Sequence, residues 1–150
     1  PLLPRMTCMW VVVHALSGLA LGTLSPLGLG PTVVGAIVLH VLLDLIPHWD
    51  YTSQHRRLVW AGLDLGTAVV VFVAVGLALD IPAGAFVVGV VSALPDLDVF
   101  DAVLPGTQRR RWFPSHWRRF PHGHAAPAVG VPVQAVIALG SLALVIISTT

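Results

Sequence analysis

Two histidines and two aspartates lie close together at the end of an apolar stretch that begins near Pro31. His40, Asp44 and His48 are spaced four residues apart, and Asp50 follows. Positions four apart on an α-helix advance by about 400°, so the first three side chains would share one face. Imidazoles and carboxylates stacked in this way are typical ligands of first-row metals. The spacing therefore predicts part of a metal site, and a helix end made polar for solubility is the alternative interpretation.

The segments that must position these residues have the composition of a membrane protein. Of the 150 residues, 56% are hydrophobic and 10% are charged, whereas about a quarter of a soluble domain is usually charged. Apolar segments separated by turns rich in Pro and Gly are predicted to be helices over 9–24, 32–46, 59–79, 83–94 and 128–147. We therefore expect an all-α fold, in which residues 1–150 form a single integral-membrane domain, a polytopic bundle of about five hydrophobic helices.

The arginines predict how this bundle is oriented. All eight fall before the first segment, between the second and third, or between the fourth and fifth. Because positively charged loops stay in the cytoplasm, the N-terminus and the loops at about 48–58 and 96–126 are predicted to be cytoplasmic. The five tryptophans would lie at or beyond the same membrane interface. The sequence thus predicts an integral protein of the plasma (inner) membrane of a prokaryote.

This topology brings more ionisable residues to the cytoplasmic ends of the helices. The further candidate metal ligands are His14, Asp64, Asp96, Asp98, His122 and His124. Ionisable groups at membrane depth cost about 2.5–3.5 kcal/mol each on insertion scales, so several together imply mutual pairing, a metal or a wet cavity. We expect a bound divalent metal, with zinc favoured, and hydrogen bonding between helices is the alternative for each residue.

The loop before the last segment alternates arginines with aromatic residues from Arg109 to Phe120. Beside a membrane such a loop lies in the headgroup layer and attracts anionic lipids. Within it, Arg118 and Arg119 are expected to bind the substrate. The apolar context favours lipid headgroups, so no nucleic-acid partner is expected, and a role in topology alone is the other interpretation. The sequence leaves the oligomeric state open.

Several enzyme classes find no support in the sequence. It contains no G-x-S-x-G elbow, no P-loop, no G-x-G-x-x-G after a strand and no C-x-x-C pair. Cys8 is the single cysteine, which gives little support to thiolate metal sites or cysteine catalysis. Histidine and aspartate chemistry remains.

These motifs, taken together, resemble those of a known family. The motifs are an early His14, then His40-x-x-x-Asp44, Pro95-Asp96-Leu97-Asp98 and His122-Gly-His124. Together they cover most of residues 9–130 and resemble the membrane-bound metal-dependent hydrolases, which include the LexA-regulated inner-membrane hydrolases and small relatives. In that family the Pro-Asp-x-Asp turn comes before the His-x-x-x-Asp helix, and the histidine loop contains Thr-His-Ser, so this chain departs in both respects. The resemblance implies phosphoester chemistry, by distant similarity to zinc-dependent phospholipase C.

The sequence is therefore interpreted as a membrane-embedded metal-dependent hydrolase acting on a phosphoester or lipid headgroup at the cytoplasmic face. The metal would lower the pKa of a bound water, with Asp50 or Asp98 as general base. One alternative is a non-enzymatic metal-binding or transport protein, which is disfavoured because the other halves of the helices carry almost no polar groups. The second is a structural membrane protein in which the His/Asp cluster locks the helices together.

Overall fold

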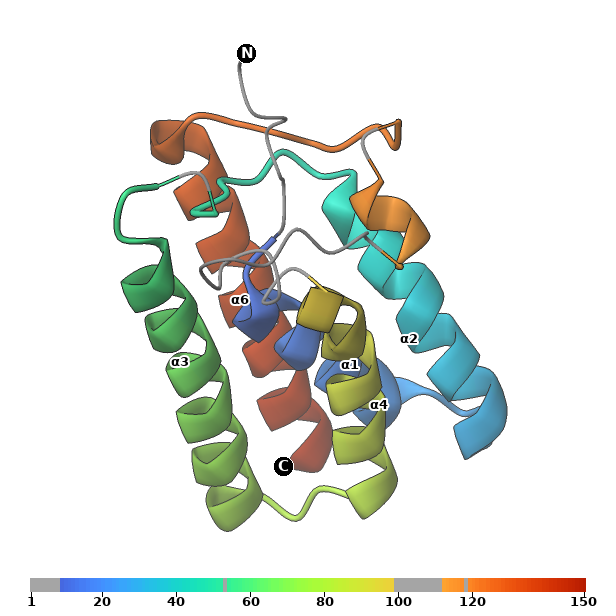
Figure 1. The fold of residues 1–150 in the computed structure, drawn as a ribbon. Coiled ribbons are helices and arrows are strands. Elements are labelled where there is room, and N and C mark those ends of the chain that lie inside the picture. Colours follow the sequence, from blue (N-terminus) through green and yellow to red (C-terminus); the bar gives the residue numbers. More distant parts are fainter. Residues whose placement is uncertain (1–8, 53, 99–111, 118) are drawn as a thin grey trace.

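The computed structural model describes residues 9–52, 54–98, 112–117 and 119–150, and their regular structure is helical (Figure 1). The elements are α1 (Val11–Leu24), α2 (Leu29–Asp44), α3 (Arg57–Ala78), α4 (Ala83–Ala93), the 3-10 helices η1 (Leu94–Asp96) and η2 (Pro114–His116), and α6 (Pro127–Thr149). Within these described ranges there is no strand, only an isolated parallel bridge between His48 and His124. The predicted all-α fold with about five hydrophobic helices is confirmed for this part of the chain.

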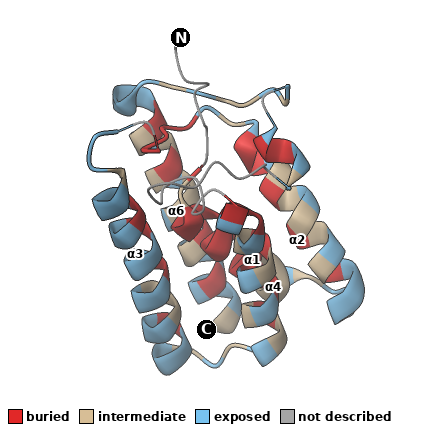
Figure 2. Ribbon diagram, in the orientation of Figure 1, coloured by how far each residue is buried: buried red, intermediate tan, exposed pale blue. Residues whose placement is uncertain are grey.

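Helix α1 lies at the centre of the fold. It contacts α2, α3, α4 and α6, and ten consecutive residues from Val11 to Ala20 are buried. Figure 2 shows most of α1 as buried and most of α3 as exposed. A helix that is apolar on every side is expected to be surrounded by others, so α1 is the element against which the site residues are arranged.

Helices α1 and α4 approach each other backbone to backbone. A Cβ placed on Gly18 would lie 2.5 Å from the Cβ of Ser92, and one on Gly89 would lie 2.9 Å from the carbonyl oxygen of Ala15. A Cβ on Gly22 would lie 2.7 Å from the backbone of α4. Gly18 and Gly22 therefore lie where the two backbones are in contact, and this is the packing that small residues allow in membrane helices.

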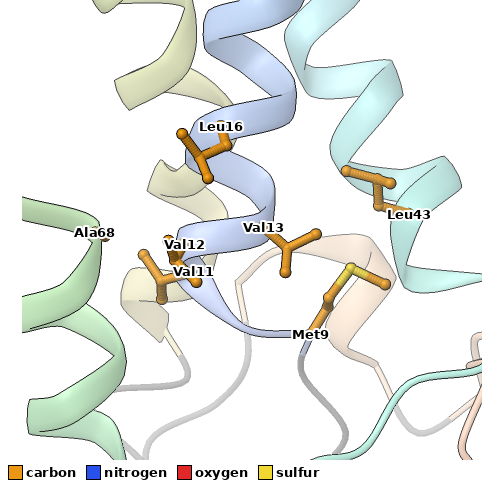
Figure 3. Packing of buried hydrophobic residues seen from close by; sticks show 7 residues of the cluster. All are labelled: Met9, Val11, Val12, Val13, Leu16, Leu43 and Ala68. Carbon is orange, nitrogen blue, oxygen red and sulfur yellow. The ribbon is translucent and has the colours of Figure 1, made fainter. Parts of the chain in front are cut away.

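An apolar cluster surrounds the first turn of α1, as Figure 3 shows. Its buried side chains come from three helices and the segment that precedes α1: Met9, Val11, Val12, Val13, Leu16, Leu43 and Ala68. Full burial of one such aliphatic side chain contributes about 1.5–3 kcal/mol. Val13 precedes His14 and Leu43 precedes Asp44 in the sequence, so this cluster holds two candidate ligands side by side.

Helices α3 and α6 are the two described helices that are long and apolar enough to cross a membrane. They contain 22 and 23 residues, whereas α1, α2 and α4 contain 14, 16 and 11, fewer than the roughly 20 that span a bilayer. The insertion of all five helices therefore stays a prediction.

The bounds of α2 differ from the prediction at both ends. The helix begins at Leu29 and includes Pro31, which was expected to lie in the preceding turn. Proline is tolerated in the first turn because the N–H groups there have no intrahelical acceptor. The helix ends at Asp44, after which the N–H groups of Leu45 and Ile46 donate to Leu42 and Leu43 in a tighter turn. Asp44 is consequently the last helical residue.

Candidate metal centre

Five metal-binding side chains meet where the N-terminal end of α1, the C-terminal end of α2, η1 and η2 come together. This metal-centre cluster consists of His14, His40, Asp44, Asp96 and His116. Each residue is buried, with an exposed fraction from 0% for the first three to 7% for His116. The sequence predicted the first four as ligands, and the structure brings them together.

The ligand atoms are separated by distances that suit metal binding. Asp44 Oδ2 lies 3.3 Å from His40 Nε2 and 3.6 Å from His116 Nε2, and Asp44 Oδ1 lies 3.4 Å from His14 Nε2. The carboxylate of Asp96 lies 3.5 Å from His116 Nε2 and 3.8 Å from His14 Nε2. Atoms bound to a tetrahedral zinc at its usual bond lengths are about 3.4 Å apart. Two overlapping ligand groups that could hold a metal ion are therefore present among the described residues: His14, His40 and Asp96, and His40, Asp44 and His116.

Hydrogen bonds behind two of the imidazoles select the nitrogen that faces the cluster. His40 Nδ1 lies 2.8 Å from the carbonyl oxygen of Ser92, to which its N–H donates. His116 Nδ1 lies 2.5 Å from Asp98 Oδ1, and Asp98 Oδ2 accepts the Phe113 N–H at 3.0 Å. Histidine ligands of metals commonly donate to a carboxylate or carbonyl in this way. Asp98, predicted as a ligand and as a general base, instead lies behind His116 and orients its ring.

The donor set fits a cation because several of its polar atoms are otherwise poorly satisfied. Neither ring nitrogen of His14 has a hydrogen-bond partner among the described residues, and its ring stacks on that of His40 at a centroid distance of 3.9 Å. Asp44 Oδ2 accepts a hydrogen bond from the Ser115 hydroxyl at 2.7 Å, whereas Oδ1 accepts none in this part of the chain. Buried polar groups without partners are unfavourable, and a divalent ion would satisfy them.

The loop before α6 is tied to the end of α2 by backbone hydrogen bonds. The His48 N–H donates to Gly123 at 2.5 Å, the Ala125 N–H donates to His48 at 2.8 Å, and the Gly123 N–H donates to Asp44 at 3.0 Å. His48 Nδ1 lies 2.8 Å from the Ile46 carbonyl, and burial lowers the pKa of His48 below its usual value. His48 is thus a neutral, buried imidazole close to the cluster but outside its two ligand groups.

Asp64 lies at the start of α1, away from the two ligand groups. Its carboxylate accepts the N–H groups of Val11 and Val12 at 2.8 and 3.1 Å and the Tyr51 hydroxyl at 3.0 Å. The first N–H groups of a helix have no intrahelical acceptor, so Asp64 caps α1 from a neighbouring helix. Asp64 was predicted as a metal ligand, but in the structure it fixes the helical turn that holds His14.

Three further predicted residues lie outside the two ligand groups. Asp50 is buried and accepts the N–H and the hydroxyl of Thr52, both at 2.7 Å. His122 is partly buried, and its Nδ1 lies 3.2 Å from the Phe120 carbonyl. His124 is exposed and lies opposite His48 in the bridge. The loop of His122 and His124 therefore packs against α2 mainly through its backbone.

The sequence interpretation missed His116 and Ser115, both of which belong to η2. The available signal was a Ser-His pair after Pro114 within the aromatic part of the basic loop, but nothing local shows that this turn reaches α2. Of the predicted substrate-binding residues, Arg119 is exposed just beyond η2, and Arg118 lies outside the described residues.

No protein-family model, no curated protein and no solved structure matches this chain. The resemblance to the membrane-bound metal-dependent hydrolases therefore stays a prediction based on motifs. Function must be inferred from the geometry of the cluster and from the apolar helices around it.

Proposed function

We propose that this chain is a polytopic protein of a prokaryotic inner membrane with its N-terminus in the cytoplasm. Outward-facing apolar side chains on the long helices, such as Leu77 (85% exposed) and Val136 (70%), support this placement because large exposed apolar surfaces need a partner. The described arginines Arg56, Arg57 and Arg119 lie next to the start of α3 and the end of η2, beyond the cluster on the same side of the fold. The positive-inside rule assigns that end to the cytoplasm, where anionic lipid headgroups are the expected partners.

The activity proposed is metal-dependent hydrolysis of a phosphoester or lipid headgroup at the cytoplasmic face. The observation that supports it best is the burial of three imidazoles and two carboxylates with ligand atoms 3.3–3.8 Å apart. Mixed nitrogen and oxygen donors favour zinc among the common divalent ions. A bound zinc supplies a water of lowered pKa and polarises a phosphoryl oxygen.

Side chains next to the cluster are proposed to orient the metal ligands, bind the phosphate and accept a proton. Asp98 keeps the ring of His116 in the tautomer that binds through Nε2. His48 is buried, and its Nε2 has no hydrogen-bond partner in the described residues. Arg119 is proposed to bind the phosphate at the surface, and Asp50 remains the proposed general base.

Metal content measured by elemental mass spectrometry on detergent-purified protein tests the proposal. We expect about one equivalent or more of zinc in the parent, lost in His40→Ala and in Asp44→Ala. His55→Ala is the matched control, because His55 is exposed and lies outside the ligand groups. A folded parent without metal after reconstitution, or equal metal in all variants, would contradict the proposal. Hydrolysis of bis(p-nitrophenyl) phosphate, lost with the metal, then tests the reaction.

A structural role is the second candidate, because the contacts of the cluster join α1, α2, η1 and η2. A structural role predicts that the protein binds no metal and that alanine substitutions in the cluster lower stability and have no other effect. Metal transport has less support, because the described core away from the cluster includes an apolar group formed by Leu19, Ala20, Val75, Ala85 and Val145.

A further inference from the structure

An apolar groove of about 200 Å³ lies between α3 and α4, with α1 as its floor. Its lining includes Ala15 of α1, Ala68 of α3 and Ala93 of α4, whose small side chains leave the space open. Larger side chains such as Val69 and Val90 form the walls. In Figure 1, α4 lies in front of α1, and α3 lies to the left of both. The groove is thus a binding surface for a slender apolar group.

The two ends of the groove differ. Near its lower end, Phe72 lies against Phe86 at a ring-centroid distance of 5.7 Å, and its ring covers Gly89, where a Cβ would lie 2.6 Å from Phe72 Cζ. At the upper end the lining includes Leu94 and Leu97. From Val90 to Leu97 the groove rises by about 10 Å. It is therefore blocked by an aromatic ring at one end and reaches η1 at the other.

The upper end of the groove and the metal-centre cluster share one turn of the chain. Leu94 and Leu97 line the groove, while Asp96 between them is buried in the cluster. Leu97 is 56% exposed, so the groove is open where it meets this turn. A chain lying along α4 would therefore bring its polar end to the turn that supplies Asp96.

We infer that the acyl chain of a membrane phospholipid occupies this groove. We also infer that the substrate of the hydrolase is such a lipid, an inference that rests on the proposed function. The groove lies beside the middle of α3, a helix long and apolar enough to cross a membrane, so under the proposed membrane placement its surroundings would be hydrocarbon. Lipid tails are as apolar as leucine, so the shape of the groove, not hydrophobicity, must select the chain.

Photo-crosslinking tests the occupant without using the metal. The probe is a phosphatidylglycerol with a diazirine on its acyl chain, in nanodiscs of phosphatidylethanolamine and phosphatidylglycerol. Val69→Trp fills the groove from its wall, and Val70→Trp is the control, because Val70 is 67% exposed and is not part of the lining. We expect crosslinks concentrated on Val69 and Val90 in the parent, lost from Val90 in Val69→Trp, and retained in Val70→Trp and after chelation.

Even labelling over the outer faces of α3 and α6, or equal labelling of Val90 in both variants, would overturn the groove as a lipid site. Crosslinks to a second copy of the chain in the groove would overturn it too.

In the hydrolysis assay, Val69→Trp should lower turnover of the long-chain phospholipid at least tenfold and leave turnover of bis(p-nitrophenyl) phosphate unchanged. If both substrates fall together, the lipid-substrate inference is wrong while the hydrolase proposal stands. If the parent binds no metal, the hydrolase proposal fails and the crosslinking result is unaffected.

Discussion

The substitution Asp98→Asn distinguishes two roles for the Asp98 carboxylate. The sequence predicts that it is a metal ligand, whereas the structure places it behind the ligand His116, whose ring it orients. Asp98 Oδ1 lies 2.5 Å from His116 Nδ1, and Oδ2 accepts the Phe113 N–H at 3.0 Å. Asparagine has nearly the same shape but only one acceptor oxygen, so its NH₂ group must face one of these donors. Either the His116 ring or the backbone of η2 therefore loses its partner.

The expected size of the effect follows from this indirect position. Removing a group that supports a metal ligand typically weakens metal affinity about 10–100-fold, which is about 1.4–2.7 kcal/mol. His116→Ala removes a ligand atom that lies 3.6 Å from Asp44 Oδ2 and 3.5 Å from Asp96. It is expected to weaken binding more than Asp98→Asn does. Zinc affinity should therefore fall from the parent to Asp98→Asn and further to His116→Ala.

Competition with a chelating indicator measures zinc affinity in the parent, Asp98→Asn and His116→Ala. Asp80→Asn is the control for the charge change, because Asp80 is exposed in the turn between α3 and α4. We expect parent affinity in Asp80→Asn and an intermediate loss in Asp98→Asn. Unchanged affinity in Asp98→Asn would refute the orienting role, and a loss as complete as that in Asp44→Ala would show that Asp98 is a ligand itself.

Three further predictions address the support of the cluster and its protons. A Cβ on Gly130 would overlap the backbone of His48 and the next residue. Gly130→Ala should therefore destabilise the protein by about 1–3 kcal/mol, which a lower Tm in detergent would show. Gly140→Ala is the control and should keep the Tm of the parent, because there is open space around Gly140. Asp64→Asn should lower stability by about 1–2 kcal/mol through the weakened helix cap and keep the bound metal, whereas a ligand role would remove it. Zinc affinity should fall as the pH drops from about 7.5 to about 5.5, because protons compete for imidazoles whose ordinary pKa is about 6.5; titrations at both pH values that agree would contradict this.

The part of the site that could be predicted from the sequence follows from the spacing of residues on a helix. His40 and Asp44 share one face because they are four residues apart, and their atoms indeed lie 3.3 Å from each other. Asp96 and Asp98 lie two residues apart in one turn after Pro95, and both contact His116, on opposite sides of its ring. Local geometry fixed these relations, so they could be predicted.

The remaining assignments depend on contacts between distant segments. His116 is brought to His40 by the docking of η2, which is 76 residues away in sequence. Asp64 is one polar residue in a long apolar helix, and hydropathy does not show which neighbour it faces. Its partners, the N–H groups of Val11 and Val12, belong to a helix whose start is known only from the fold.

The two long helices place the cluster inside the fold and not at its end. Asp64, which binds the first turn of α1, lies about two turns into α3. Gln134, which accepts the Trp10 N–H at 2.9 Å, lies about two turns into α6. Both helices thus extend about 10 Å beyond the start of α1. Because His14 is in the first turn of α1, the metal-centre cluster is recessed to a level at which α3 and α6 present apolar surface outward. Under the membrane placement that we propose, a substrate drawn from the lipid would approach the cluster at this level.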